Sequence, residues 1–293
     1  MTTTEPVAIC PNPIFVIGSP RSGTSILPWS LAQHPTLWTS RETDFLYELF
    51  GRDRASRAYD AASSRPGTWI QEHQVDRREF LAFVGAGLNA LLTSRSGGKR
   101  WIDQTPLYTL MVDELACLFP GAQFLHIVRD GRRVVHSMVH FGEALGRNLQ
   151  ATGHLPDWAT GFDEASRTWR RFVEAAAAFC TDNPARCLTI RNEELASDPD
   201  AGFQRILSFV GASFDRAPAD FFRSSRINSS FESNRWVVSR DLEPTHPETG
   251  RREEAWHGWT ADERRVFVEE AGELLITLGY ATASELAMEN GAP

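Results

Sequence analysis

The sequence predicts an α/β fold in three layers, with a central parallel sheet flanked by helices. Two short apolar runs, residues 14–17 and 124–128, have the length and composition of strands that are buried on both faces. Each run is followed by a polar turn and then by residues with helical spacing, which is typical of a strand-turn-helix unit. Further strands are expected at residues 37–39, 101–103 and 186–190.

The turn after the first run is the most informative stretch of the chain. It begins at Gly18 and has the sequence GSPRSGTS, so Gly23 and Ser25 fit the phosphate-binding pattern GxxxxGK[ST]. Thr24 stands where that pattern has lysine, and the cation is Arg21, inside the loop. Backbone N–H groups at the start of a helix attract a phosphate or a sulfate. The stretch predicts a P-loop-like anion site, and a plain glycine turn with a helix cap is the alternative.

A second, basic turn follows the run at residues 124–128. It begins at Arg129, and Ser137 lies two helical turns further on, where it can face the same side. A carboxylate, Glu42, follows the short strand predicted at residues 37–39. In open α/β sheets functional groups gather at the carboxyl ends of the strands, so we expect Glu42 to lie near the first turn.

The whole chain of 293 residues is predicted to form a single domain, because no internal repeat and no clean linker divides it. A helical insertion is expected at about residues 46–100, and a lid-like loop rich in glycine at about residues 142–162. Residues 224–252 are expected to be irregular and basic. The last helix is expected to start at Thr260, where Glu263 would complete a capping box.

Composition argues against several classes of function. The net charge of −8 does not suit a nucleic-acid partner or an anionic membrane surface. No apolar run approaches the ~18 residues that span a bilayer. The first ten residues lack the basic and apolar parts of a signal peptide. We therefore expect a cytoplasmic protein without stable membrane insertion.

Cysteine and histidine spacing does not predict a metal site. The four cysteines include no CxxC pair, and reduced thiols are expected at Cys10, Cys117, Cys180 and Cys187. His136 and His140 are four residues apart on a predicted helix, but the sequence offers no obvious acidic third ligand.

Taken together, these motifs resemble those of the sulfotransferases that use 3′-phosphoadenosine 5′-phosphosulfate (PAPS), in particular a bacterial branch related to carbohydrate and tyrosylprotein enzymes. The first turn looks like the family loop for the 5′-phosphosulfate, and IVRDGRRVVHS at residues 127–137 looks like the segment for the 3′-phosphate. Supporting matches are SRETDFL at 40–46, WIDQTP at 101–106 and NEELASDP at 192–199. The resemblance covers about residues 14–280 and leaves the insertion and the lid-like loop poorly matched.

The resemblance implies a set of residues that bind the donor. They are Arg21, Ser22, Gly23, Thr24, Ser25, Arg129, Ser137, Arg251 and Arg252. The backbone N–H groups of residues 22–25 would hold the 5′-phosphate, and Arg21 would cover the bridging oxygen as the bond breaks. Arg129 and Ser137 would hold the 3′-phosphate, and one of the two late arginines would close over it.

The resemblance also implies an in-line transfer of the sulfuryl group to an acceptor hydroxyl, which leaves adenosine 3′,5′-bisphosphate (PAP). Glu42 would take the proton from the hydroxyl as general base, and Asp44 and Asp103 are the runners-up. Arginine supplies positive charge without titrating, so no metal is required. The acceptor is expected to be a small molecule, a sugar or a glycolipid, and the sequence does not predict the oligomeric state.

Three positions depart from the family pattern. Gln104 stands where many relatives have lysine, and Asn192 and Ile26 stand where cytosolic members have aromatic residues near the adenine. Two other functions therefore stay open. One is a nucleotide kinase with a degenerate P-loop, and the other is an inactive homologue that binds PAP or PAPS.

Overall fold

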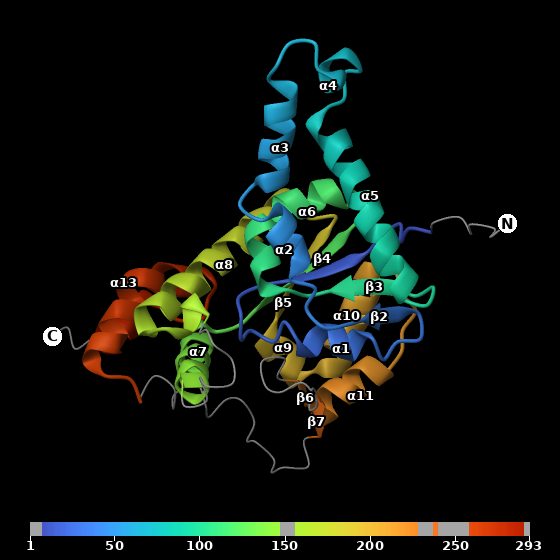
Figure 1. Ribbon diagram of the computed structural model, residues 1–293. Coiled ribbons are helices and arrows are strands. Elements are labelled where there is room, and N and C mark those ends of the chain that lie inside the picture. Colours follow the sequence, from blue (N-terminus) through green and yellow to red (C-terminus); the bar gives the residue numbers. More distant parts are fainter. Residues whose placement is uncertain (1–7, 147–155, 228–236, 240–257, 290–293) are drawn as a thin grey trace.

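A five-stranded sheet forms the centre of the molecule (Figure 1). This computed structural model describes residues 8–146, 156–227, 237–239 and 258–289. The strands are β1 (Ile14–Ile17), β2 (Leu37–Thr39), β3 (Arg100–Asp103), β4 (Gln123–Val128) and β5 (Cys187–Arg191). Their order is β2-β3-β1-β4-β5, and each neighbouring pair is parallel. The predicted α/β class, with helices around a parallel sheet, is confirmed.

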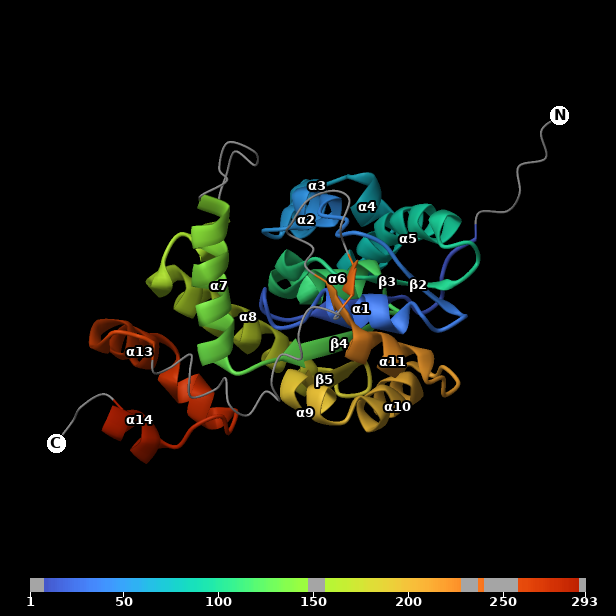
Figure 2. The same cartoon turned by 90° about the horizontal axis from the view of Figure 1, so that it is seen from below.

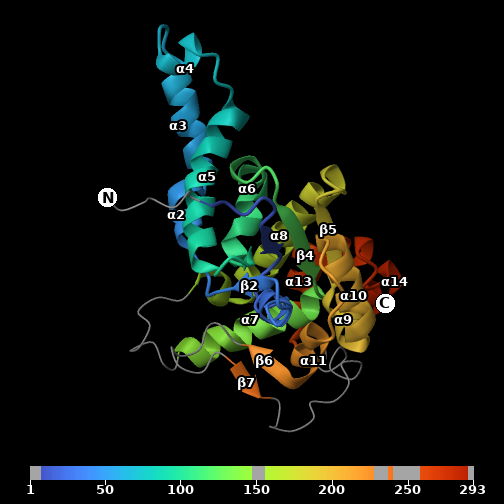
Figure 3. The same ribbon diagram turned by 90° about the vertical axis from the view of Figure 1, so that its right-hand side faces the viewer.

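Alternate residues of β1 enter two different cores, one on each face of the sheet. Phe15 and Ile17 pack with α5 (Arg77–Arg95), α6 (Val112–Leu118) and α8 (Phe162–Asp182). Ile14 and Val16 pack with α1 (Ile26–Leu31), α9 (Asn192–Ser197), α10 (Pro199–Val210) and α11 (Ala217–Ser224). Helices therefore cover both faces (Figure 3), which explains why this strand is apolar at every position.

The insertion between β2 and β3 is an arm of helices that projects beyond the sheet (Figure 1). Its helices are α2 (Phe45–Phe50), α3 (Arg54–Ser63), α4 (Trp69–Glu72) and α5. The buried carboxylate of Glu114 on α6 accepts hydrogen bonds from the backbone N–H and the hydroxyl of Ser56, at 3.0 and 3.2 Å. A Cβ at Gly85 would lie 1.8 Å from the carbonyl oxygen of Leu118, so the close packing of α5 on α6 requires glycine. These contacts tie the base of the arm to the sheet domain.

The second turn leads into α7 (Gly131–Gly146), which is followed by the short 3-10 helix η2 (Asp157–Ala159). Residues 142–146 were expected to begin the lid-like loop, but they continue α7. Glu143, Ala144 and Leu145 are strong helix formers, and they outweigh the glycines at both ends of this stretch. Residues 147–155 of the expected loop lie outside the described residues.

Helix α13 (Ala261–Thr277) packs along α8 (Figure 2). It was expected to be the last helix, but α14 (Ala283–Glu289) follows it. The expected capping box is confirmed. The Thr260 side chain accepts from the backbone N–H of Glu263, and the Glu263 carboxylate accepts from the backbone N–H of Thr260. Phe267 of α13 and Trp169 of α8 belong to the same buried cluster.

Two predictions about local structure were wrong. Residues 224–252 were expected to be irregular, but within the described part of this stretch β6 (Ser225–Ile227) and β7 (Val237–Ser239) pair as antiparallel strands. Residues 228–236 and 240–252 lie outside the described residues. All four cysteines were expected to be thiols, but Cys180 and Cys187 form a disulfide, with Cα atoms 5.0 Å apart. The turn from α8 into β5 brings these two side chains together, which their spacing in the sequence does not reveal. The helices within the described ranges are all too short or too polar to cross a membrane.

Candidate functional site

The first turn is held against β4 and the 3-10 helix η1 (Pro106–Met111) by contacts at its glycines. Gly18 has φ +148°, and a Cβ there would lie 2.4 Å from the carbonyl oxygen of Ile127. The hydroxyl of Thr109 accepts from the Gly18 N–H at 2.9 Å and donates to the Gly18 carbonyl at 3.1 Å. The start of the turn is therefore fixed from both sides.

Asn192 supports the other half of the first turn. Its side-chain amide donates to the carbonyl of Ser22 at 3.1 Å, and a Cβ at Gly23 would lie 2.6 Å from the same nitrogen. Asn192, which stands where cytosolic members have an aromatic residue near the adenine, is buried under the turn. The Ser22 N–H donates to the Ser19 carbonyl at 3.2 Å, so this amide is used inside the loop and does not face an anion in this conformation. Anion binding by the N–H groups of residues 23–25 stays a prediction.

A buried polar network builds the second turn, and sequence analysis missed most of its members. Asp130 and Arg132 form an ion pair at 2.8 Å, and both are buried. Glu193 accepts from the Asp130 N–H and from the Tyr280 hydroxyl, each at 2.9 Å. Trp169 donates its indole N–H to the carbonyl of Arg129 at 3.2 Å. Because these groups satisfy one another, they fix the position at which Arg129 leaves the sheet.

The two turns meet through three of the predicted donor-binding residues. The Arg21 Nε donates to the hydroxyl of Ser137 at 3.2 Å, and an Arg129 Nη donates to the Arg21 carbonyl at 3.4 Å. Arg21 has a left-handed backbone, with φ +69°, and its guanidinium lies 5.0 Å from the ring centre of Phe141. Burial, and then the charge of Arg129, lower the pKa of Arg21. Two cations held this close favour an anion beside them.

The predicted general base lies beside a group of buried polar residues at the end of β3. Gln104 donates its amide to Glu42 at 3.4 Å. Thr43 donates to the Asp103 carboxylate at 2.6 Å and lies 2.6 Å from the Tyr108 hydroxyl. Burial, together with the charges of Glu42 and Asp44, raises the pKa of Asp103 to about 7. Of the two runners-up, Asp103 is buried and Asp44 is exposed.

Two predicted residues, Arg251 and Arg252, lie outside the described residues, so their role stays a prediction. His136 and His140 lie side by side on α7, with ring centres 4.0 Å apart and ring planes tilted by 37°. Within the described part of the chain, no group of three or more His, Cys, Asp or Glu side chains is arranged to hold a metal ion.

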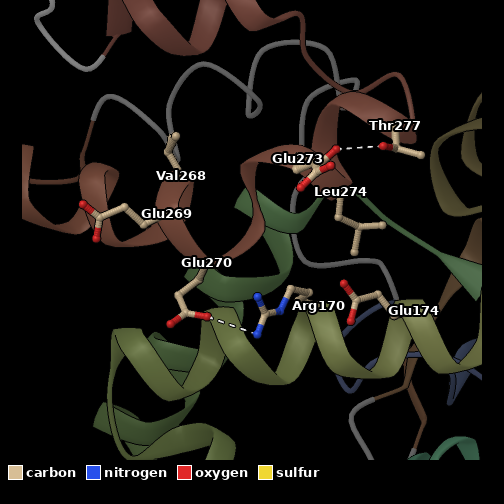
Figure 4. Close-up of a pocket in the computed structure, with 8 residues that line it drawn as sticks. All are labelled: Arg170, Glu174, Val268, Glu269, Glu270, Glu273, Leu274 and Thr277. Carbon is tan, nitrogen blue, oxygen red and sulfur yellow. Dashed lines mark hydrogen bonds and ion pairs between the residues drawn. The ribbon is translucent and has the colours of Figure 1, made fainter.

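A groove between α8 and α13 is separate from the two turns (Figure 4). It is lined by Arg170, Glu174, Val268, Glu269, Glu270, Glu273, Leu274 and Thr277. Arg170 forms an ion pair with Glu270 across it at 3.4 Å, whereas the neighbouring Trp169 turns inward to Arg129. The groove is acidic, so it does not suit a phosphate-bearing ligand.

Comparison with known proteins relates the chain to one family. A sequence profile described as the sulfotransferase family matches residues 13–216. Protein-tyrosine sulfotransferase of Drosophila melanogaster is 26% identical over 206 residues, which are 70% of this chain and 39% of that protein. Nodulation protein NoeE of Sinorhizobium fredii is 24% identical over 304 residues, 97% of this chain and 70% of that protein.

The fold has a counterpart among solved structures. The sulfotransferase domain from the curacin biosynthetic pathway aligns with a TM-score of 0.52 at 17% identity, over 91% of this chain and 98% of that one. At this identity the match shows a shared fold. The chain spans about half the length of tyrosine sulfotransferases that it matches, for example 51% of protein-tyrosine sulfotransferase 2 of Gallus gallus.

Proposed function

Because the chain belongs to the sulfotransferase family, we propose that it transfers a sulfuryl group from PAPS to an acceptor hydroxyl. The observation that carries this proposal is the contact between the two turns. Arg21 of the first turn reaches Ser137 on α7, and Arg129 of the second turn reaches back to the Arg21 carbonyl. A donor that carries phosphates on both the 3′- and the 5′-oxygen of one ribose suits cations supplied by two such turns.

Buried polar atoms in the first turn also suit an anionic donor. The hydroxyl oxygen of Ser22 is buried and has no hydrogen-bond partner among the described residues, so it can donate to a 5′-phosphate. The mutual repulsion of Arg21 and Arg129, which helps to lower the pKa of Arg21, would be offset by a phosphate beside them. In this proposal Arg129 and Ser137 hold the 3′-phosphate.

The chemistry balances without a further reactant. The acceptor oxygen forms a bond to sulfur, its proton passes to the carboxylate of Glu42, and the bond from sulfur to the bridging oxygen breaks. PAP leaves with the electron pair of that bond. Arg21 would stabilise the charge that develops on the leaving phosphate, and Gln104 holds one oxygen of Glu42 in the place where relatives have a cation.

The arm borders the acceptor side in this proposal. Helix α2 begins at Phe45, three residues after Glu42, and it contacts η1. Leu49 of α2 is 52% exposed and Leu107 of η1 is 37% exposed. These exposed apolar side chains, on two elements that contact each other, favour an acceptor with an apolar part, such as a small natural product or a glycolipid.

The decisive experiment compares Glu42→Gln with the wild-type protein. Binding of PAP, measured by isothermal titration calorimetry, should be unchanged, because the substitution leaves both turns intact. Transfer of ³⁵S from labelled PAPS to a panel of phenols, sugars and glycolipids should fall by ~10²–10⁴, the usual contribution of a general base. Glu48→Gln, an exposed glutamate on α2, is the matched control and should keep the wild-type rate.

The other outcomes are equally informative. Full turnover in Glu42→Gln would place the base elsewhere, with Asp103 as the first alternative. Binding of PAP without transfer to water or to any acceptor would indicate the inactive homologue. Tighter binding of ATP–Mg²⁺ than of PAP would contradict the proposal as a whole and favour a kinase.

A further inference from the structure

Hydrogen bonds link the side chains of three residues: Thr43, which follows Glu42 in the chain, Asp103 and Tyr108. The Thr43 hydroxyl donates to Asp103 at 2.6 Å. Since this uses its one proton, the Tyr108 hydroxyl, also at 2.6 Å, donates to Thr43. Asp103 and Tyr108 are both buried, with exposed fractions of 4% and 0%. Thr43 is therefore held by two short bonds from residues that are themselves fixed in the core.

The backbone around Thr43 requires such support. Asp44 has φ +35°, a region that residues other than glycine rarely occupy. The N–H of Phe45 donates to the carbonyl of Thr43, which closes a three-residue turn around Asp44. A conformation of this kind persists only where neighbouring contacts impose it. The bonds to Asp103 and Tyr108 are contacts of that kind.

The direction of the Glu42 carboxylate depends on this turn, since Glu42 is the residue before Thr43. The hydrogen bond from Gln104 to Glu42 is 3.4 Å long, whereas the two bonds that hold the neighbouring Thr43 are each 2.6 Å long. A base must lie within hydrogen-bond reach of the proton that it removes, and a misplacement of about 1 Å can cost ~10²-fold in rate.

We propose that Thr43 is a positioning residue that aims the Glu42 carboxylate at the acceptor oxygen, with Asp103 and Tyr108 holding Thr43 in place. This rests on the proposed function of Glu42 as general base. Three residues act together: Thr43 lies next to the base, and Asp103 and Tyr108, 60 and 65 positions further along the chain, hold Thr43 by hydrogen bonds. Asp103, the runner-up for the base, becomes part of the support.

The test uses Thr43→Val, which keeps the shape of the side chain and removes both hydrogen bonds. Release of ³⁵S-sulfate from labelled PAPS, with water as the acceptor, reports transfer without knowledge of the natural acceptor. We expect kcat to fall about tenfold or more, while KM for PAPS and the Kd for PAP stay unchanged. Thr43→Ser retains the hydroxyl and should restore most of the rate. Tyr108→Phe should lower kcat in the same direction.

A matched control and a double variant exclude a merely structural effect. Thr39→Val removes the hydroxyl of a different threonine, a buried one that donates to the Ile102 carbonyl at 3.0 Å, and it should leave kcat unchanged. In a Glu42→Gln background, adding Thr43→Val should cause no further loss, because Thr43 acts through Glu42.

Two results would overturn the inference: an unchanged rate in Thr43→Val, or the same fractional loss in the Glu42→Gln background as in the wild type. A wild-type rate in Glu42→Gln alone would instead remove the proposed base, whatever Thr43 does. The failure of the inference and the failure of the proposed function can therefore be told apart.

Discussion

Replacing Arg129 by alanine tests whether the second turn binds the 3′-phosphate of the donor. In the structure this guanidinium donates at 3.4 Å to the Arg21 carbonyl of the first turn, and in the proposed function it binds the 3′-phosphate. A hydrogen bond to a charged group contributes about 1.5–3 kcal/mol. Arg129→Ala should therefore weaken PAP binding about 10- to 150-fold, at ~1.4 kcal/mol for each factor of ten.

Adenosine 5′-monophosphate lacks the 3′-phosphate and provides the internal comparison. Isothermal titration calorimetry with both ligands should show a large loss for PAP and little change for the monophosphate. Arg205→Ala, an exposed arginine on α10, changes the net charge equally and should affect neither ligand. Equal losses for the two ligands in Arg129→Ala would refute the assignment.

Two further predictions concern stability. Gly18→Ala should cost roughly 3 kcal/mol in urea unfolding, because its Cβ would lie 2.4 Å from the Ile127 carbonyl oxygen, whereas Gly87→Ala, with open space around it, should cost nothing. A small loss in Gly18→Ala would show that the turn can move away from β4. Burial lowers the pKa of His126 to about 4, so between pH 4.5 and 6.5 only the unfolded chain protonates it and stability rises with pH. Asp103, with its pKa raised to about 7, keeps its proton only in the folded state over this range, so it makes stability fall with pH. Asp103→Asn should therefore show a steeper rise with pH than the wild type and His126→Gln a shallower one, each by up to about 1.4 kcal/mol per pH unit. Parallel curves for the three proteins would contradict these signs.

Most of the sheet could be predicted from the sequence, because buried parallel strands leave a local pattern. Four consecutive apolar residues at Ile14–Ile17, followed by a glycine turn, identify a central strand without knowledge of its neighbours. The two turns and the carboxylate after β2 were found for the same reason. Helix ends with local signals were also found, as at Thr260, where both partners of the capping box lie within one turn.

The partners that make these stretches into a site could not be found in this way. Asn192 supports the first turn from 170 residues away, and Tyr108 contacts Thr43 from 65 residues away. Nothing in the neighbouring sequence distinguishes such a residue from any other polar residue near a strand end. The disulfide between Cys180 and Cys187 was missed because it depends on how α8 turns into β5.

The sequence by itself determined which segments form the central parallel sheet, where its two polar turns lie, and which carboxylate follows a strand end. These features depend on the spacing of apolar residues and glycines within about ten positions. Only the tertiary structure decided that Arg21 meets Ser137, and that Thr43 lies between Asp103 and Tyr108. The order of the strands in the sheet brings these residues into contact. That order depends on how helices pack on both faces of the sheet rather than on any one stretch of the chain.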